Sequence, residues 1–427
     1  MTGRYKEYPK YKYSGEIWLN EVPEHWNVVK LSYFLKLQSG DSITSNHIEN
    51  EGLYPVMGGN GHRGYTSTFN CNGKYALIGR QGALCGNINL ACGKFYASEH
   101  AIVVYPNVDF NLTFLSGFLR FMNLGQYSVS AAQPGISVER INGLKIAFPS
   151  IDEQNVIGQF LDHETAKIDT LITKQEKLIE LLKEKRQAVI SHAVTKGLNP
   201  DASMKDSGVE WLGEVPEHWA VSKLKWKAQT TSGGTPSTSK YEVYYEGGDI
   251  PWIRTTDLNN GKLLATPVSI TAKALEDTAC SILPKYSVLL AMYGGAGSIG
   301  KHSLLMFEAA INQAVCGIYP SSSFEPEFLH YFYEFYRPFW MINAAGTRKD
   351  PNIGQDHIKE AKIALPPKEE QRAIVAYVNK TLDLLNKLND KAIEAIELAK
   401  ERKTALISAA VTGKIDVRDW QPKGVQG

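Results

Sequence analysis

WLNEVPEHW occupies residues 18–26, and WLGEVPEHW occupies residues 211–219. A phrase with two Trp, one Pro and one His recurs with a single difference, which is too improbable for chance and predicts an internal repeat. The offset in numbering between the two copies is 193 (211 minus 18). A second pair, KIAFPSIDEQ at 145–154 and KIALPPKEEQ at 362–371, has an offset of 217 (362 minus 145). The chain is therefore expected to alternate a variable module and a constant segment twice.

Bulk properties set limits on the fold. The 427 residues suffice for roughly two to four domains that each bury a core. The first residues, MTGRYKEYPKYKY, contain no apolar signal core, and no apolar run reaches the length of a membrane span, so we expect a soluble, cytoplasmic protein without a membrane partner. An odd number of Cys without a C-x-x-C pair predicts reduced thiols, and these are Cys71, Cys85, Cys92, Cys280 and Cys316.

Each constant segment reads as a long helix. Acids follow the Pro that precedes it, at Asp152-Glu153 and Glu369-Glu370, as the positive end of a helix dipole favours. Each helix should run about 40 residues, or roughly 60 Å. Inward positions that step by four and three predict that the helices pack on each other as a coiled coil, and the alternative is two separate amphipathic helices on globular cores. The predicted seam residues are Ile157, Leu161, Ile168, Leu171, Leu178, Leu182, Val189, Ile374, Val378, Leu385, Leu388, Ala392, Ala395, Ala399 and Leu406.

The two variable segments share an order of elements although their sequences differ. LYPVMGG at 53–59 matches DIPWIRT at 249–255, and the glycine loop IGRQGALCG at 78–86 matches MYGGAGSIG at 292–300. A strand ending in Tyr-Pro and an aromatic helical stretch then follow in both copies. We therefore expect an α+β protein with two similar mixed α/β domains, 1–150 and 207–367, and two helical regions, 151–206 and 368–427.

These features resemble a known family. The paired WLxEVPEHW phrases, the IGRQG loop, the Gly-Ile-Ser element at 135–137 and the repeated helix led by Glu-Gln resemble the specificity subunit of Type I restriction-modification systems, over nearly the whole chain. The resemblance implies two target-recognition domains separated by an antiparallel coiled coil, each reading one half of a gapped DNA target. Double-stranded DNA, two methyltransferase subunits and, in the nuclease, two restriction subunits are the implied partners. S-adenosylmethionine is implied in the methyltransferase, with no cofactor and no catalytic residue in this chain.

Candidate catalytic and ligand motifs lack their required context. Gly59-x-Gly61-x-x-Gly64 and Gly295-x-Gly297-x-x-Gly300 have dinucleotide-binding spacing, but neither has an acid at the expected distance, so we interpret them as tight turns. No Asn-Pro-Pro-aromatic tetrapeptide is present, and the ten His show no ligand spacing, so no metal site is expected. Two rivals to DNA recognition remain, a self-contained enzyme and a protein-binding adaptor.

Charge does not support a stand-alone DNA binder. Residues 1–150 carry 13 Lys and Arg against 10 Asp and Glu, or +3, and residues 207–367 carry 14 against 16, or −2. Phosphate neutralisation supplies most non-specific affinity for DNA, so a stand-alone binder normally has a clear basic excess. Our hypothesis is that partner subunits contact the phosphates while this chain contacts bases.

The polar loops of the modules are the candidate base-reading segments. Arg can bridge guanine, and Asn or Gln can bridge adenine, in the major groove. For single residues a structural role remains open: Arg80 as an ion pair, His62 as a solvated turn and Tyr293 as a packed strand residue. The candidates are Asn60, His62, Arg63, Tyr65, Arg80, Gln81, Gln133 and Ser137 in the first module, and Arg254, Thr255, Thr256, Asp257, Tyr293, Lys301, Arg348 and Lys349 in the second.

The repeated phrase itself is interpreted as a structural latch. A base-reading segment should differ between modules that read different sequences, and this phrase does not. Two Trp and a Leu would fold the start of each module onto its core or the helix base, with Pro fixing the turn. His25 and His218 are then hydrogen-bonded structural residues, and a shared docking surface for the methyltransferase is the alternative.

Overall fold

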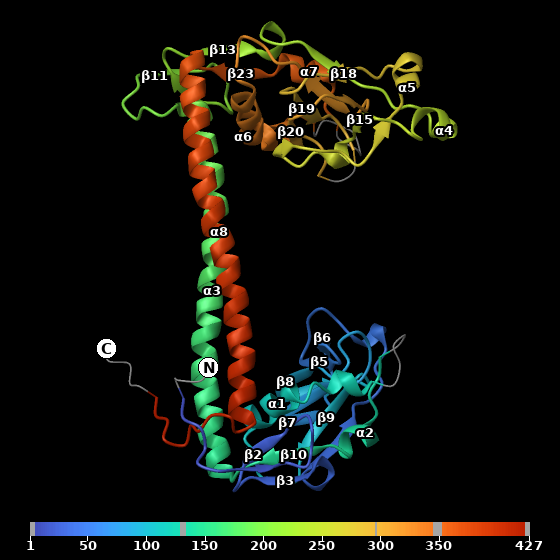
Figure 1. The fold of residues 1–427 in the computed structure, drawn as a ribbon, viewed down its shortest axis with the longest axis vertical. Coiled ribbons are helices and arrows are strands. Elements are labelled where there is room, and N and C mark those ends of the chain that lie inside the picture. The colour runs from blue at the N-terminus through green and yellow to red at the C-terminus, as the bar shows by residue number, and fades with distance from the viewer. Residues whose placement is uncertain (1–4, 129–133, 295–296, 345–351, 423–427) are drawn as a thin grey trace. The chain divides into compact units, whose positions relative to one another are not determined.

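The computed structural model describes residues 5–128, 134–294, 297–344 and 352–422, with the backbone alone described for 341–344. The chain divides into two compact units (Figure 1). Unit 1 comprises residues 1–176 and 393–427, and unit 2 comprises residues 177–392. Each unit holds one of the predicted modules together with part of both long helices, so the division falls within the helices.

The described part of unit 1 is built on a six-stranded sheet in the order β4-β9-β7-β8-β5-β6. Strands β7 and β9 pair near its centre, and their apolar runs at 76–78 and 101–104 are buried. Helix α1 packs against β7 and β8, and β10 pairs with β3 just before the first long helix. The elements are β1 Tyr11–Tyr13, β2 Glu21–Pro23, β3 Asn27–Lys30, β4 Leu35–Ser39, β5 Tyr54–Gly58, β6 Gly61–Thr66, β7 Cys71–Gly79, β8 Ile88–Ala97, β9 Ala101–Pro106, α1 Leu112–Phe121, α2 Val138–Asn142 and β10 Lys145–Phe148.

The described part of unit 2 contains a five-stranded sheet, β14-β22-β19-β20-β16, and a four-stranded sheet, β17-β15-β21-β18. Helix α6 packs against β20 and β19, as α1 packs in unit 1. The elements are β11 Met204–Asp206, β12 Glu214–Pro216, β13 Ala220–Lys223, β14 Thr230–Ser232, α4 Tyr241–Tyr244, β15 Ile250–Ile253, β16 Lys262–Leu263, β17 Ser269–Ile270, α5 Ala272–Asp277, β18 Ile282–Leu283, β19 Val288–Ala291, β20 His302–Leu305, β21 Ala309–Ile311, β22 Val315–Ile318, α6 Pro326–Ala344, α7 Gln355–Glu360 and β23 Lys362–Leu365.

The two units share one topology, as the sequence predicts. The order β4-β9-β7-β8 of unit 1 corresponds to β14-β22-β19-β20 of unit 2. The pair β3 and β10 likewise corresponds to β13 and β23, and β1 with β2 corresponds to β11 with β12. The units differ beyond this shared part, because β5 and β6 extend the main sheet of unit 1 whereas β15 belongs to a second sheet in unit 2.

Helices α3 (Ile151–Lys196, 46 residues) and α8 (Lys368–Val411, 44 residues) are slightly longer than predicted. In unit 1 the first half of α3 packs with the second half of α8, and Lys403 Nζ lies 2.6 Å from Asp169 Oδ1. In unit 2 the second half of α3 shares a core with the first half of α8. Within each unit the helices therefore run antiparallel.

The predicted seam requires a correction of phase. Leu171, Leu178 and Leu388 were expected to face the partner helix, but they are 46%, 38% and 41% exposed. Two successive four-residue steps, at 164, 168 and 172 in α3 and at 374, 378 and 382 in α8, place the next three-residue step one position later than predicted. Ile172, Ile179 and Asn389 are the less exposed neighbours of these three residues, and Ile396 is more buried than the predicted Ala395. The predicted positions that are buried are Ile157, Leu161, Ile168, Val189, Ile374, Val378, Leu385, Ala392, Ala399 and Leu406, while Leu182 and Ala395 are half-buried.

Two further expectations concern the cysteines and the membrane. The five Cys are free thiols, and Cys71, Cys280 and Cys316 are buried. Within the described ranges, none of the helices combines the length and apolar character needed to cross a membrane.

Candidate nucleic-acid interface

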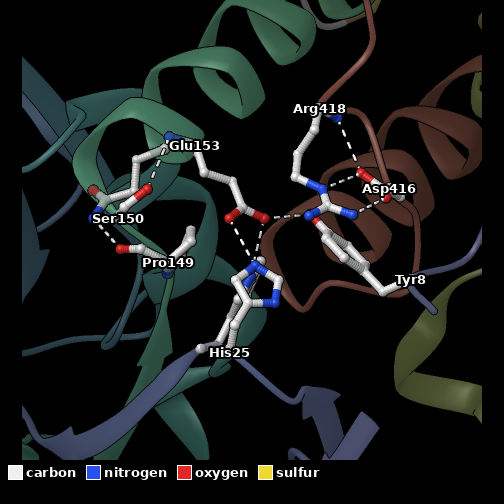
Figure 2. A network of polar contacts seen from close by, with 9 residues as sticks. Tyr8, His25, Pro149, Ser150, Glu153, Asp416 and Arg418 are labelled. Carbon is white, nitrogen blue, oxygen red and sulfur yellow. Dashed lines mark hydrogen bonds and ion pairs between the residues drawn. The ribbon is translucent and has the colours of Figure 1, made fainter. Parts of the chain in front are cut away.

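The repeated phrase of unit 1 is fastened to the first turn of α3. Glu153 is 8% exposed there, and its Oε1 accepts hydrogen bonds from the Tyr8 hydroxyl at 2.7 Å and the Trp26 indole N–H at 3.1 Å. The His25 Nε2 lies 2.8 Å from the other carboxylate oxygen, and Figure 2 shows His25 and Tyr8 converging on Glu153. Burial, followed by the Glu153 carboxylate, raises the pKa of Tyr8, so its hydroxyl stays protonated and can donate.

Unit 2 repeats this arrangement at the first turn of α8. Glu370 is the counterpart of Glu153 at the helix offset of 217 (370 minus 153), and it accepts a hydrogen bond from the Trp219 indole N–H at 3.1 Å. The His218 Nε2 lies 2.7 Å from its other oxygen. The end of the other long helix lies nearby in each unit, because Gly413 adjoins Pro23 and Gly197 adjoins Trp219. The phrase therefore joins the start of one long helix to the end of the other.

The Gln that follows each Glu connects the start of the long helix to the aromatic helix of the module, which is α1 in unit 1 and α6 in unit 2. In unit 1 the Gln154 Oε1 accepts the backbone N–H of Asn111, directly before α1. In unit 2 the Gln371 Oε1 accepts the backbone N–H of Glu325, directly before α6. The first Trp of each phrase packs on the same helix, with Trp18 beside Phe118 and Trp211 beside Tyr336. These contacts confirm that the phrase is a structural latch and that His25 and His218 are hydrogen-bonded residues.

A cleft of about 960 Å³ opens in unit 1, away from the latch residues, where the β5–β6 hairpin crosses the end of β7. The crossing brings backbone against backbone. A Cβ on Gly79 would lie 2.4 Å from the Gly59 carbonyl oxygen, and a Cβ on Gly59 would lie 2.9 Å from the His100 carbonyl oxygen. Glycine is required at both positions because backbone atoms cannot yield to a side chain as a flexible side chain would. Gly59 thus lies in a tight turn, as predicted, whereas Gly61 and Gly64 lie in strand β6 and not in further turns.

The cleft gathers four predicted side chains from segments far apart in the sequence. Asn60, His62, Arg63 and Gln81 all line it, and all four are exposed. Gln81 is anchored by a β-bridge to Gly135, and its side-chain oxygen lies 3.1 Å from the His100 Nδ1. An exposed Arg, Asn and Gln in one concave surface provide the donor and acceptor types that read guanine and adenine edges.

Three predicted residues flank the cleft without lining it. Tyr65 is half-buried, and its ring lies 4.8 Å from the His62 ring. Ser137 caps helix α2 by accepting the Arg140 backbone N–H at 3.4 Å. The pKa of the neighbouring Glu139 carboxyl is lowered by hydrogen bonds from its own backbone N–H and the Ser137 hydroxyl, and then by the positive charge of Arg80. Arg80 therefore has an acidic neighbour, in line with the structural alternative considered for it.

The candidates of unit 2 are less favourably placed. Thr255 is 8% exposed, and the Asp257 side chain, 7% exposed, accepts two hydrogen bonds from the Arg254 guanidinium at 3.3 and 3.1 Å. Thr255 and Asp257 were predicted to contact bases, but burial leaves them little surface to offer. The Asp257 carboxylate holds the turn at 255–257 by accepting from the Arg254 backbone N–H and guanidinium. Thr256 and Tyr293 are exposed, and Lys301 is half-buried.

Several candidates cannot be placed, and one cleft residue was missed. Gln133, Arg348 and Lys349 lie outside the described residues. His100 lines the cleft although the sequence pattern did not single it out. It sits in the short polar turn between strands β8 and β9, and β9 pairs with β7, so a polar turn next to the partner strand of the IGRQG loop is the signal that could have found it.

The family follows from the comparison with known sequences. Residues 23–181 and 216–398 match the family described as the Type I restriction modification DNA specificity domain. The chain belongs to this family. The two matched stretches begin within the two copies of the latch phrase, so each unit contributes one specificity domain.

Individual relatives agree with the family. The chain is similar to the Type I restriction enzyme EcoprrI specificity subunit of Escherichia coli, with 42% identity over 145 residues, which is 33% of this chain and 35% of that protein. It is 27% identical over 418 residues to the Type I restriction enzyme MjaVIII specificity subunit of Methanocaldococcus jannaschii, covering 93% of this chain and 95% of that protein.

Solved structures show the same fold. One, described as "Structural basis underlying complex assembly and conformational transition of the type I R-M system", matches with a TM-score of 0.69 at 15% identity and covers 91% of this chain and 98% of that chain. The HsdS subunit from Thermoanaerobacter tengcongensis matches with a TM-score of 0.56 at 16% identity, covering 92% and 98%.

Proposed function

We propose that this chain is the DNA-recognition subunit of a Type I restriction-modification complex. Each specificity domain would read one half of a gapped, two-part DNA target, and the chain would direct methyltransferase and restriction subunits to that target in the cytoplasm. It would contribute no catalytic residue of its own.

The observation that carries this proposal is the contrast between latch and cleft. The latch uses the same residue types at the same helix position in both units, whereas the residues of the unit 1 cleft differ from those at the matching place in unit 2. A shared scaffold with divergent polar loops is what two readers of different sequences require. Membership of the DNA specificity domain family supports the same conclusion.

The partners we propose follow from the internal repeat and from charge. Two similar units offer two similar surfaces, which suits two methyltransferase subunits, each carrying its own S-adenosylmethionine. The net charge of the whole chain is +1, too low for a protein that neutralises many phosphates alone. We therefore infer that the partner subunits supply most phosphate contacts and that this chain supplies base contacts. Tight binding of unrelated DNA by the purified chain alone would contradict that inference.

We further propose that the long helices set the gap between the two half-sites. A helix of 46 residues is about 69 Å long at about 1.5 Å per residue. Inserting one heptad into the middle of α3, with a matching heptad in α8, should lengthen the gap while leaving both half-sites unchanged. An unchanged gap in a folded, active variant would contradict the role of the helices as a ruler.

A map of methylated bases in the genome of the source cell, with this gene intact and deleted, tests the function. The expected result is that one gapped, two-part motif loses its methylation on deletion and regains it when the gene is restored. An unchanged map, in cells shown to express this chain and its methyltransferase, would favour the alternative of a non-catalytic protein-binding adaptor.

A further inference from the structure

Two buried histidines and a glutamate meet where helix α6 packs on strand β20 in unit 2. His302 begins β20, and His330 and Glu334 lie one turn apart on α6. One donor atom from each residue can be chosen so that all three atoms lie within 4.8 Å of one another. The two imidazole rings are tilted by 50°, with centroids 4.8 Å apart. Strand and helix therefore bring together residues that are 28 and 4 positions apart in the sequence (330 minus 302, 334 minus 330).

Three of the four ring nitrogens of these histidines have no hydrogen-bond partner among the described residues, although both rings lie in an apolar core. His302 is fully buried and His330 is 4% exposed, among the aromatic side chains that α6 packs against the sheet. Among the described residues, the nitrogens that lack a hydrogen-bond partner are both ring nitrogens of His302 and the Nδ1 of His330. The nearby Gly300 carbonyl favours a protonated His302 ring but does not meet either nitrogen in hydrogen-bond geometry. An unsatisfied buried polar atom costs about 1–3 kcal/mol, so two such rings call for an explanation.

Unit 1 provides an internal comparison. The offset in numbering between the glycine loops at 78–86 and 292–300 is 214 (292 minus 78), and the same offset relates Asn111 to Glu325, which precede α1 and α6 (325 minus 111). At this offset, His302, His330 and Glu334 correspond to Ile88, Ser116 and Arg120. Packing of this helix on this strand therefore does not need imidazoles, because the same junction is closed in unit 1 by an Ile and by Arg120 donating to the Ile88 carbonyl.

We propose that His302, His330 and Glu334 bind one divalent first-row transition metal ion, with Zn²⁺ the best match, as a structural site of unit 2. Neutral imidazole nitrogens and a carboxylate oxygen are the ligands that zinc prefers, at about 2.0–2.2 Å. Three donors all 4.8 Å apart would be about 2.8 Å from a central ion, so each needs to move inward by less than about 1 Å.

The charges around the site are consistent with this role. Burial lowers the pKa of both histidines, that of His330 to about 4, so both rings are neutral and can donate lone pairs at neutral pH. Each of the three cations near the rings has a partner of its own, and for Arg186 that partner belongs to the proposed site. Arg186 holds Glu334 at 3.1 Å, Lys262 pairs with Glu327, and Arg337 donates to the Gly297 carbonyl. Arg186 would orient the carboxylate, as the outer partners of metal ligands commonly do.

Metal analysis of the full-length chain tests the proposal. The chain is stripped with a chelator, dialysed against Zn²⁺, and its bound zinc is measured by mass spectrometry. The expected result is one Zn²⁺ per chain for the wild type, with an affinity at least about 100-fold lower for His302→Ile and Glu334→Gln. His302→Ile installs the residue that unit 1 uses, which favours a folded variant, and circular dichroism checks this. His192→Gln, an exposed histidine on α3, is the matched control and should bind zinc like the wild type.

Two independent readings distinguish this site from incidental binding. Zinc should raise the melting temperature of the stripped wild type, and a chelator should reverse the rise, whereas neither should shift that of the His302→Ile variant. Cobalt bound at the site should give visible absorption bands that His330→Ser removes. The proposal would be overturned if the folded wild type bound no stoichiometric zinc and its melting temperature changed with neither zinc nor chelator. It would also be overturned if the variants bound zinc as fully as the wild type.

Discussion

The latch at Glu153 and the latch at Glu370 occupy the same position on two long helices and use the same His and Trp partners. They differ in what surrounds them. Within the described residues, Glu153 also accepts the Tyr8 hydroxyl, and its side chain is 8% exposed, whereas the Glu370 side chain is 25% exposed. The repeated sequence thus supplies a His and a Trp partner for the Glu of each latch. In unit 1, sequence outside the repeat adds Tyr8 as a third partner.

The chain termini account for the difference. In unit 1 the segment around Tyr8 is held by a β-bridge from Lys6 to Asp416, and the Arg418 guanidinium lies over the Tyr8 ring at 4.9 Å while pairing with Asp416 (Figure 2). These two segments, around Tyr8 and around Asp416 and Arg418, form a strap beside the Glu153 side chain. The first and last segments of the chain therefore stabilise unit 1, and unit 2 must hold its latch without them.

The largest expected effect separates the two glutamates. Glu153→Ala leaves the buried Tyr8 and Trp26 and the exposed His25 without their acceptor and should lower the free energy of unfolding by about 3 kcal/mol. Glu370→Ala should cost about 1.5 kcal/mol, because this carboxylate has fewer partners and is itself more exposed. Urea unfolding of the full chain gives the size, and hydrogen exchange in α1 and α6 assigns it to a unit. Asp152→Ala, on the exposed neighbour, is the control. Equal losses in the free energy of unfolding for Glu153→Ala and Glu370→Ala would show that the strap does not stabilise the latch of unit 1.

The next effect should be the same in both units. Trp26→Phe and Trp219→Phe each remove one indole N–H donor while keeping an aromatic ring in the core, so each should cost about 1–2 kcal/mol. The two values, measured by the same urea unfolding, are expected to agree within about 0.5 kcal/mol. A much larger loss at Trp26 would mean that the strap acts through the indole and not through the Glu153 carboxylate.

The smallest stability effect isolates the strap. Tyr8→Phe should cost about 1 kcal/mol in the wild-type chain, because one buried hydrogen bond is lost. In a Glu153→Ala background the same change should cost less than about 0.5 kcal/mol, since its acceptor is already gone. An undiminished cost in that background would place the role of Tyr8 in packing, and the ring contact with Arg418 would then be the one to examine by Arg418→Ala.

A feature of this protein could be predicted from the sequence where the residues that form it lie close together in the chain. The latch phrase could be identified because two nearly identical spellings signal a shared structural need. Glu153 and Glu370 were assigned to the helix dipole alone, although their offset of 217 in numbering, shared with the helices, pointed to a common role. The predicted phase of the coiled coil failed in the middle of the helices, at Leu171, Leu178 and Leu388, where two successive four-residue steps move the buried position by one residue.

The sites were harder to predict because they are assembled from distant strands. Asn60, Arg63 and Gln81 could be selected as polar loop residues, but only the strand order brings them to one cleft with His100. Thr255 and Asp257 were chosen by the same criterion and proved to be buried, because a polar residue in a loop can equally serve the turn itself. His302 and His330 escaped a search for ligand spacing because a strand and a helix supply them.

We propose that the latch is a shared scaffold and that the unit 1 cleft reads one half of the DNA target. The most direct measurement is a genome-wide map of methylated bases in cells that carry Arg63→Ala and Gln81→Ala in place of the wild type, with the stability of the purified variant checked by urea unfolding. We predict that one half of the two-part motif changes or loosens, that the other half is unchanged, and that stability shifts by less than about 0.5 kcal/mol. A motif unchanged in both halves, or altered in both halves together, would contradict the claim.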